Sequence, residues 1–273
     1  MNTKAIFSDL DGTLLTDAKE ITPGNRAAID AALARGHKFI ITTGRPLDSA
    51  IQQAEALGLT GEGCYLIAFN GAVLYDTGAR KTIFQQNLPL PLAEKAWREA
   101  RRRGIHIQTY DDSHVLVEPS CDDVEIRRYC EIIHTKYRVI PDISALTQAP
   151  PKLLLIHYPR DGALEDFRLW LLSWCQGELD TFYSSPELLE VVCAGMNKGS
   201  ALRRLSELLG IPNEDTISIG DSGNDLAMIR AAGTGVAMIN GVEEVRAAAD
   251  RITLRDNNHD AIAEVLEALV LCD

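Results

Sequence analysis

Asp9 and Asp11 stand two residues apart, directly after an apolar stretch at residues 4–8. In a parallel α/β sheet the carboxyl ends of the strands form the ligand crevice, so both side chains can face it. One carboxylate could then attack a phosphorus atom while the other handles the proton of the leaving oxygen. Gly12 permits the tight backbone path that this requires. An acidic capping turn is the alternative, but such turns usually lack an apolar strand directly before them, so the run predicts a catalytic carboxylate pair.

Two further segments could hold an anion. Thr43, Gly44 and Arg45 follow the apolar stretch 38–41 and precede an expected helix. A hydroxyl and free backbone N–H groups at this place suit a phosphate, although simple capping of the helix is the alternative. Lys198 opens a later helix, where its ammonium could neutralise phosphate and the aspartate nucleophile. For a single lysine near a helix start, surface solvation is the commoner explanation.

The run Gly220–Asp225 ends another apolar strand and contains two carboxylates. Mg²⁺ prefers oxygen ligands in octahedral geometry and takes one or two carboxylates, completing its shell with water and substrate phosphate. Asp9 and Asp221, from neighbouring strand ends, would satisfy that preference, with Asp225 orienting the waters. A Gly- and Asp-rich turn that caps the next helix is the alternative.

Strands and helices alternate in both terminal thirds of the chain, and this order would position the four segments. Continuous apolar strands separated by helices indicate a parallel sheet covered on both faces. We therefore predict an α/β, Rossmann-like doubly wound parallel sheet. The expected strands are 4–8, 38–41, 65–69, 216–219 and 235–238. The expected helices are 23–35, capped by Thr22 and begun by Pro23, then 47–57, 198–209, one ending near 232, and 258–271.

The middle of the chain has a different pattern of polar and apolar residues, and this pattern predicts an inserted α+β unit. Its strands 105–108 and 114–117 mix polar with apolar residues, and a core-type strand is expected at 153–156. Helices are expected at 91–103, 122–134 and 161–175. Only 33 residues separate Asp9 from Thr43, whereas 154 separate Thr43 from Lys198, so the insertion must fall in the second interval. We place the core at 1–83 and 189–273, and the insertion at 84–188.

Composition excludes several classes of protein. Apolar residues make up 46% of the 273 and charged residues 24%, which is ordinary for a globular protein. The net charge of −12 argues against a nucleic-acid partner. No stretch is apolar enough for a membrane span or a signal peptide, and the six cysteines contain no Cys-x-x-Cys pair. A cytoplasmic enzyme is the expectation.

Together the four segments resemble the haloacid dehalogenase-like (HAD) superfamily, and the chain resembles its Cof-type sugar-phosphate phosphatases. Along the chain, the four segments supply in turn a nucleophile, a hydroxyl, a lysine and the metal-binding carboxylates. The resemblance covers essentially the whole length and includes Asn70–Ala72, Asn197–Gly199 and Gly220–Met228. It implies that Asp9 is the nucleophile that becomes an aspartyl-phosphate and that Asp11 is the general acid and then the base.

The same resemblance implies the ligands of the site. Mg²⁺ would be bound by Asp9, the main-chain carbonyl of Asp11 and Asp221, with Asp225 close by. The expected phosphate and substrate contacts are Thr43, Gly44, Arg45, Asn70, Lys198 and Asn224. The insertion would be a cap that excludes water and selects the substrate, a small phosphorylated metabolite. Candidate selecting residues, for each of which a surface or structural role is the commoner explanation, are His106, Tyr110, His114, Glu118 and Arg138.

Other functions on the same core are a phosphomutase or phosphotransferase, and a phosphatase for nucleotides or phosphorylated cofactors. A mutase would pass the phosphoryl group to a second hydroxyl and would need an intermediate shielded from water. A non-catalytic sensor of phosphorylated metabolites is a further alternative. The sequence argues against the sensor, because every proposed catalytic position holds a competent residue.

Overall fold

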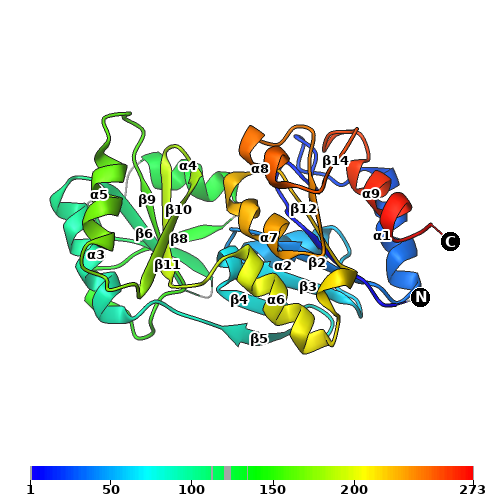
Figure 1. Ribbon diagram of the computed structural model, residues 1–273. Helices are drawn as coiled ribbons and strands as arrows, with labels where there is room; N and C mark the ends of the chain where they lie inside the picture. The colour runs from blue at the N-terminus through cyan, green and yellow to red at the C-terminus, as the bar shows by residue number, and fades with distance from the viewer. Residues whose placement is uncertain (1, 112, 120–123, 134, 273) are drawn as a thin grey trace. The chain divides into compact units, whose positions relative to one another are not determined.

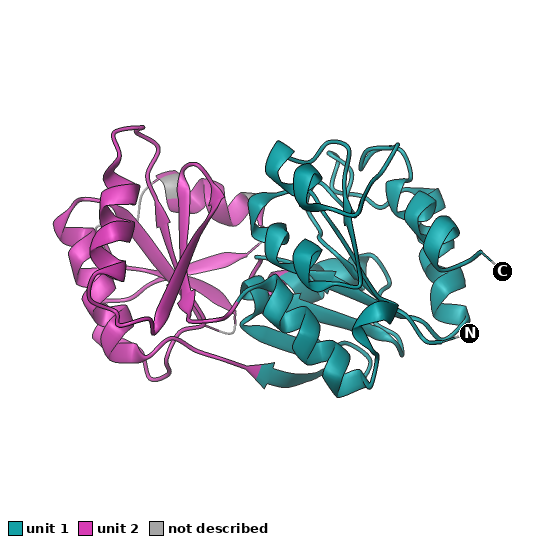
Figure 2. Ribbon diagram, viewed as in Figure 1, with its two compact units in different colours: residues 1–44, 50–84, 197–273 teal, residues 45–49, 85–196 magenta. Residues whose placement is uncertain are grey.

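The computed structural model describes residues 2–111, 113–119, 124–133 and 135–272 (Figure 1). The chain divides into two compact units (Figure 2). The first consists of Met1–Gly44, Ala50–Phe84 and Asn197–Asp273, and the second of Arg45–Ser49 and Gln85–Met196.

The first unit is built on an eight-stranded sheet with the order β14-β13-β12-β1-β2-β3-β4-β5. Its strands are β1 Ala5–Ser8, β2 Lys38–Thr42, β3 Cys64–Ala68, β4 Val73–Asp76, β5 Lys81–Gln85, β12 Thr216–Gly220, β13 Thr234–Ala237 and β14 Arg251–Ile252. All neighbours from β14 to β3 pair in parallel, which confirms the predicted fold class. The β3–β4 pair is antiparallel and adds a hairpin that the sequence pattern did not predict.

Helices cover both faces of this sheet. They are α1 Pro23–Ala34, α2 Leu47–Ala56, α6 Lys198–Leu209, α7 Leu226–Ala231, α8 Glu243–Ala248 and α9 Ala261–Leu269, with 3-10 turns η1 Phe69–Gly71, η4 Asn213–Asp215 and η5 Gly223–Asp225. The first turn of α2 is grouped with the second unit. Phe7 of β1 packs in one cluster with Leu202 and Leu205 of α6, whereas its neighbour Ile6 is fully buried on the opposite face.

Local hydrogen bonds explain where these helices begin. The Thr22 side chain accepts from the Asn25 amide, and Pro23 is the first residue of α1, as predicted. The last helix begins at Ala261, not at 258 as predicted. Asp260 stands in the left-handed region at φ 60°, and a residue in that conformation cannot continue a right-handed helix.

The second unit contains a six-stranded sheet with the order β10-β11-β9-β6-β7-β8. Its strands are β6 His106–Tyr110, β7 His114–Val117, β8 Lys136–Val139, β9 Leu153–Ile156, β10 Leu179–Ser185 and β11 Leu188–Cys193. Its helices are α3 Leu90–Arg102, α4 Val124–Ile132 and α5 Ala163–Leu172, with a 3-10 turn η3 Ile143–Ala145. Parts of the predicted helix 122–134 lie outside the described residues.

One face of this second sheet packs on helices α3 and α5. Trp97 of α3, Phe167 of α5 and Leu155 of β9 are fully buried in a single apolar cluster. Most strand pairs are antiparallel, and β7 and β8 are parallel, so the unit is an α+β structure as expected. Within the described part of the chain, no helix has the length and apolar character needed to cross a membrane.

Candidate active site

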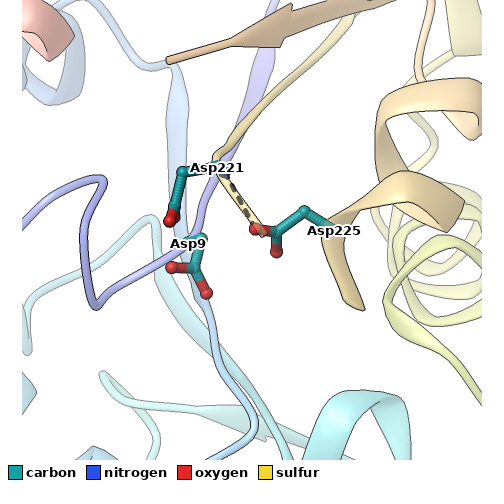
Figure 3. A group of neighbouring side chains, drawn as sticks. All are labelled: Asp9, Asp221 and Asp225. Carbon is teal, nitrogen blue, oxygen red and sulfur yellow. Dashed lines mark hydrogen bonds between the residues drawn. The ribbon is translucent and has the colours of Figure 1, made fainter. Parts of the chain in front are cut away.

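Three carboxylates converge where β1 and β12 end. Asp9 follows β1, Asp221 follows β12, and Asp225 closes the turn η5. Each offers a carboxylate oxygen, and these three oxygens lie within 4.8 Å of one another (Figure 3). Parallel pairing of β1 with β12 brings the two strand ends to one edge, and the Asp9 amide donates to the Ile219 carbonyl at 2.9 Å. The sheet therefore assembles the carboxylates that the sequence placed in separate segments.

Lys198 is the cation of this group. Its ammonium donates to Asp9 Oδ1 and to Asp225 Oδ1, each at 2.5 Å. The side chain is fully buried, so surface solvation is excluded as the explanation for this lysine. Burial by itself lowers the pKa of the ammonium, but the carboxylates of Asp225 and Asp9 outweigh it and raise the pKa above its ordinary value. Lys198 is therefore a permanent positive charge.

Burial and mutual repulsion act on the carboxylates. Burial raises the pKa of Asp9 well above its ordinary value, and the charge of Asp225 adds to the rise. The pKa of Asp221 is raised for the same two reasons. Three carboxylates and one ammonium leave two uncompensated negative charges, which one divalent cation would cancel. The oxygen-only donor set also matches Mg²⁺, so these residues fit that ion.

The carboxylate of Asp225 is already occupied on both oxygens. Oδ1 accepts from Lys198, and Oδ2 accepts from the amides of Asp221 at 3.0 Å and Ser222 at 2.9 Å. Asp225 thus holds in place both the Lys198 ammonium and the loop that follows β12. Asp221 likewise accepts on both oxygens, from the hydroxyls of Thr13 at 2.8 Å and Ser222 at 2.9 Å.

Two polar residues that were not predicted from the sequence hold the loops after β1 and β12 together. The Thr13 hydroxyl donates to Asp221 Oδ1, and the Asn240 side chain donates to the Gly12 carbonyl, both at 2.8 Å. Gly12 has φ +84°, and a Cβ there would come 2.8 Å from Asp221 Oδ2. Asn240 follows β13, so the signal that selected the other residues, a polar side chain just after a strand end, would have found it too.

Asp11 stands apart from the three-carboxylate group. Its Oδ1 accepts from the Lys19 ammonium at 2.7 Å, and its side chain is 39% exposed. Lys19 was not selected from the sequence, and nothing in its spacing distinguishes it from a solvated lysine. The Asp11 carboxylate is thus paired with Lys19 rather than with the buried acidic group.

The predicted phosphate contacts of the first unit lie at neighbouring strand ends. The Thr43 carbonyl accepts from the Asn70 amide at 3.0 Å, and the Asn224 side chain donates to Asn70 Oδ1 at 3.1 Å. Gly44 packs against the same side chain, since a Cβ on it would lie 3.0 Å from Asn70 Nδ2. Arg45 is grouped with the second unit.

Glu118 and Tyr110 of the second unit have internal partners. Glu118 is fully buried, accepts from Trp97 Nε1 at 2.5 Å and forms an ion pair with Arg101. This pairing ties β7 to α3 and assigns Glu118 a structural role. The buried Tyr110 hydroxyl accepts from Gln108 and lies 2.8 Å from the Tyr129 hydroxyl.

The remaining candidates of the second unit also contact neighbours. His106 Nε2 lies 3.1 Å from Gln108 Oε1, His114 Nδ1 lies 2.8 Å from Ser113 Oγ, and Arg138 pairs with Asp111 at 2.7 Å. Their roles in selecting a substrate stay predictions.

A buried ion pair in the second unit was missed. Lys152 Nζ donates to Glu190 Oε2 at 2.8 Å, and both side chains are at most 5% exposed. Glu190 interrupts the apolar strand Leu188–Cys193, and that interruption was the available signal.

Comparison with known proteins agrees with this geometry. Residues 6–266 match the model of a haloacid dehalogenase-like hydrolase family. The 5-amino-6-(5-phospho-D-ribitylamino)uracil phosphatase YitU of Bacillus subtilis is 30% identical, over 96% of this chain and 96% of its own. The pyridoxal phosphate phosphatase YbhA of Escherichia coli is 29% identical, over 97% and 98%. A crystal structure of a haloacid dehalogenase-like hydrolase from Bacteroides thetaiotaomicron superimposes with a TM-score of 0.87 at 32% identity, covering 98% and 99%.

The chain belongs to the haloacid dehalogenase-like hydrolase family, and it is an enzyme of the phosphatase class. The resemblance found in the sequence is thereby confirmed, together with the fold that it implied.

Proposed function

We propose that the enzyme hydrolyses small phosphorylated metabolites, sugar phosphates in particular, through an aspartyl-phosphate on Asp9 with Mg²⁺ bound beside it. The observation that carries this proposal is the buried Lys198 ammonium bridging Asp9 and Asp225 within a group of three carboxylates. The relatives YitU and YbhA are named for a phosphoribityl compound and for pyridoxal phosphate, which are small phosphate monoesters. Phosphorylated cofactors are therefore the second substrate class to test.

In the first step, a carboxylate oxygen of Asp9 attacks phosphorus and the bond to the leaving oxygen breaks. Lys198 holds Oδ1 of Asp9, which leaves Oδ2 as the oxygen that can attack. Asp11 gives its proton to the leaving alkoxide. In the second step Asp11 takes a proton from water, which attacks phosphorus and restores the Asp9 carboxylate. Dividing the reaction in this way replaces one difficult displacement by two easier ones.

Charge neutralisation accounts for the remaining residues. Mg²⁺, held by Asp9, Asp221 and the Asp11 carbonyl, would supply positive charge against the phosphoryl oxygens. Lys198 keeps Asp9 oriented and contributes a fixed positive charge on the same side. Fixed charges that need no reorganisation during the reaction are among the largest contributions to catalysis.

Asp9→Asn tests the nucleophile. The amide keeps the shape of the side chain but cannot form the acyl phosphate, so kcat should fall on the order of 10⁴-fold or more. The measurement is release of inorganic phosphate from a panel of sugar phosphates and from pyridoxal phosphate. Appreciable residual turnover in this variant would exclude Asp9 as nucleophile. Transfer to an added sugar hydroxyl in place of phosphate release would favour the phosphomutase.

Asp11→Asn tests the proton donor. Loss of general acid catalysis should lower kcat about 10²-fold for an alkyl phosphate. The loss should be smaller for an aryl phosphate, whose leaving oxygen needs no proton. Mg²⁺ binding, measured by calorimetry, should persist because the Asp11 carboxylate is paired with Lys19 outside the acidic group. A collapse of metal affinity would contradict this division of roles.

A further inference from the structure

The ion pair between Lys19 and Asp11 closes a loop that begins at the proposed nucleophile. Lys19 Nζ donates to Asp11 Oδ1 at 2.7 Å across eight positions of the chain, so the two residues are not neighbours on one helix. Their side chains are 45% and 39% exposed, and a pair this open to solvent contributes little to stability. Its place on the proposed general acid is therefore the feature that sets it apart from other surface pairs.

The main chain on the Asp11 side of this pair is held at two points. The Gly12 carbonyl accepts from the Asn240 side chain at 2.8 Å. The Thr13 hydroxyl donates to Asp221 Oδ1 at 2.8 Å. Because the backbone that follows Asp11 is fixed in this way, the direction of its carboxylate depends on its own side-chain torsions and on the groups that the carboxylate contacts.

The turn that carries Lys19 is also tightly held. Lys19 stands in the left-handed region at φ 64°, which is uncommon for a residue with a side chain. Its amide donates to the Thr16 carbonyl at 2.9 Å, and the Thr16 amide donates to the Glu20 carbonyl at 2.8 Å. Asn257 Nδ2 anchors the start of the turn by donating to the Leu15 carbonyl at 3.0 Å. Backbone strain persists where the surrounding structure enforces it, and these hydrogen bonds enforce it here.

The two carboxylates of the opening run thus contact two different lysines. Lys198 donates to Oδ1 of Asp9 inside the buried group, and Lys19 donates to Oδ1 of Asp11 outside it. An oxygen that accepts from an ammonium does not carry the proton of a carboxylic acid. A general acid that is held by Lys19 therefore delivers its proton from Oδ2.

We propose, on the basis of the proposed function, that Lys19 is a positioning residue that directs Oδ2 of Asp11 toward the leaving oxygen of the substrate. In the first step the bond between Asp9 and phosphorus forms, the bond to the leaving oxygen breaks, and the proton passes from Asp11 Oδ2 to that oxygen. Lys19 keeps its own protons throughout. General acid catalysis contributes about 10²- to 10⁴-fold, and a displacement of about 1 Å can remove much of such an effect.

The dependence of the rate on the leaving group tests this role. The quantity to measure in the full chain with Mg²⁺ is kcat/KM, which covers every step up to release of the alcohol. Lys19→Met keeps the length of the side chain and removes the ammonium. It should lower kcat/KM about tenfold for glucose 6-phosphate or pyridoxal phosphate, whichever the wild type hydrolyses faster. For p-nitrophenyl phosphate, whose leaving oxygen needs no proton, kcat/KM should stay within about twofold.

Three further variants separate positioning from other effects. Lys19→Arg keeps a cationic donor and should recover most of the activity toward the alkyl ester. Lys81→Met removes the same charge from an exposed position on β5 of the same unit, and it should leave both values of kcat/KM unchanged. In the Asp11→Asn background Lys19→Met should add nothing, because Lys19 acts through Asp11. The midpoint of thermal unfolding should be the same in Lys19→Met as in the wild type.

Three results would overturn the role of Lys19. They are an unchanged kcat/KM for the alkyl ester in Lys19→Met, an equal loss for the alkyl and aryl esters, and a further loss in the Asp11→Asn background. Failure of the proposed function gives different results. A wild type that releases no phosphate would overturn that function, and an Asp11→Asn variant without leaving-group dependence would overturn the role of Asp11; the inference about Lys19 would fall with either.

Discussion

Each of the two units buries a lysine against carboxylates, and the two clusters differ in their charge balance. In the first unit, Lys198 faces Asp9 and Asp225, with Asp221 beside them, so two negative charges remain. In the second unit, the buried Lys152 pairs with Glu190, one positive charge with one negative charge.

The difference separates a site from a structural pair. Glu190 also accepts from Ser184, and the Lys152 ammonium lies 5.1 Å from the centre of the Tyr110 ring, so that pair is completed by its own surroundings. In the cluster of the first unit, burial and then the charge of Asp225 raise the pKa of Asp9. A cluster of this kind requires a cation, and perturbed carboxylates concentrate at functional sites.

Among the variants that test this comparison, Lys198→Met should have the largest effect on activity. Removing the one ammonium of the first cluster takes away a fixed charge used in phosphoryl transfer, so kcat should fall about 10³-fold. The measurement is phosphate release at saturating substrate. Lys152→Met, in a cluster without excess charge, should leave the chemical step much less affected. An equal fall in kcat in Lys198→Met and Lys152→Met would show that the two clusters do not differ in their role in catalysis.

Glu190→Gln should destabilise the second unit. It removes the carboxylate that faces the buried Lys152 ammonium, at a cost of about 3 kcal/mol. Denaturation followed by tryptophan fluorescence reports on this unit, because Trp97, Trp170 and Trp174 all belong to it. The control is Glu187→Gln, whose partner Arg160 is 84% exposed, and about 0.5 kcal/mol or less is expected. An unchanged free energy of unfolding in Glu190→Gln would show that the Lys152–Glu190 ion pair does not stabilise the unit.

Mg²⁺ should stabilise the first unit by a smaller amount. At ten times its dissociation constant, an ion bound by the folded state alone contributes about 1.4 kcal/mol. Calorimetry in EDTA and in Mg²⁺ measures the shift in melting temperature. Asp221→Asn should abolish the shift, whereas Asp161→Asn, in the second unit, should preserve it. Stabilisation that persists in Asp221→Asn would place the ion elsewhere.

Much of the first unit was predictable because its signals are local. A continuous apolar run followed by Asp9, or by Thr43, marks a buried parallel strand and its carboxyl end. Parallel pairing then brings such ends to one edge without further information. The β3–β4 hairpin and the paired strands β10 and β11 were missed, since polar residues in these segments weaken their periodicity.

The sequence by itself determined the class of fold, the family and the carboxylates of the site, because each follows from residue types at short spacing. Only the tertiary structure decided how the charged groups are paired. Lys198 was predicted at the site, and the structure adds that it is fully buried against Asp9. Glu118, one of several candidates in the insertion, is bonded to Trp97, and Asp11 is turned toward Lys19. Such pairings join residues far apart in the chain or depend on burial. The local sequence specifies neither the ion-pair partner of a charged side chain nor the dielectric around it.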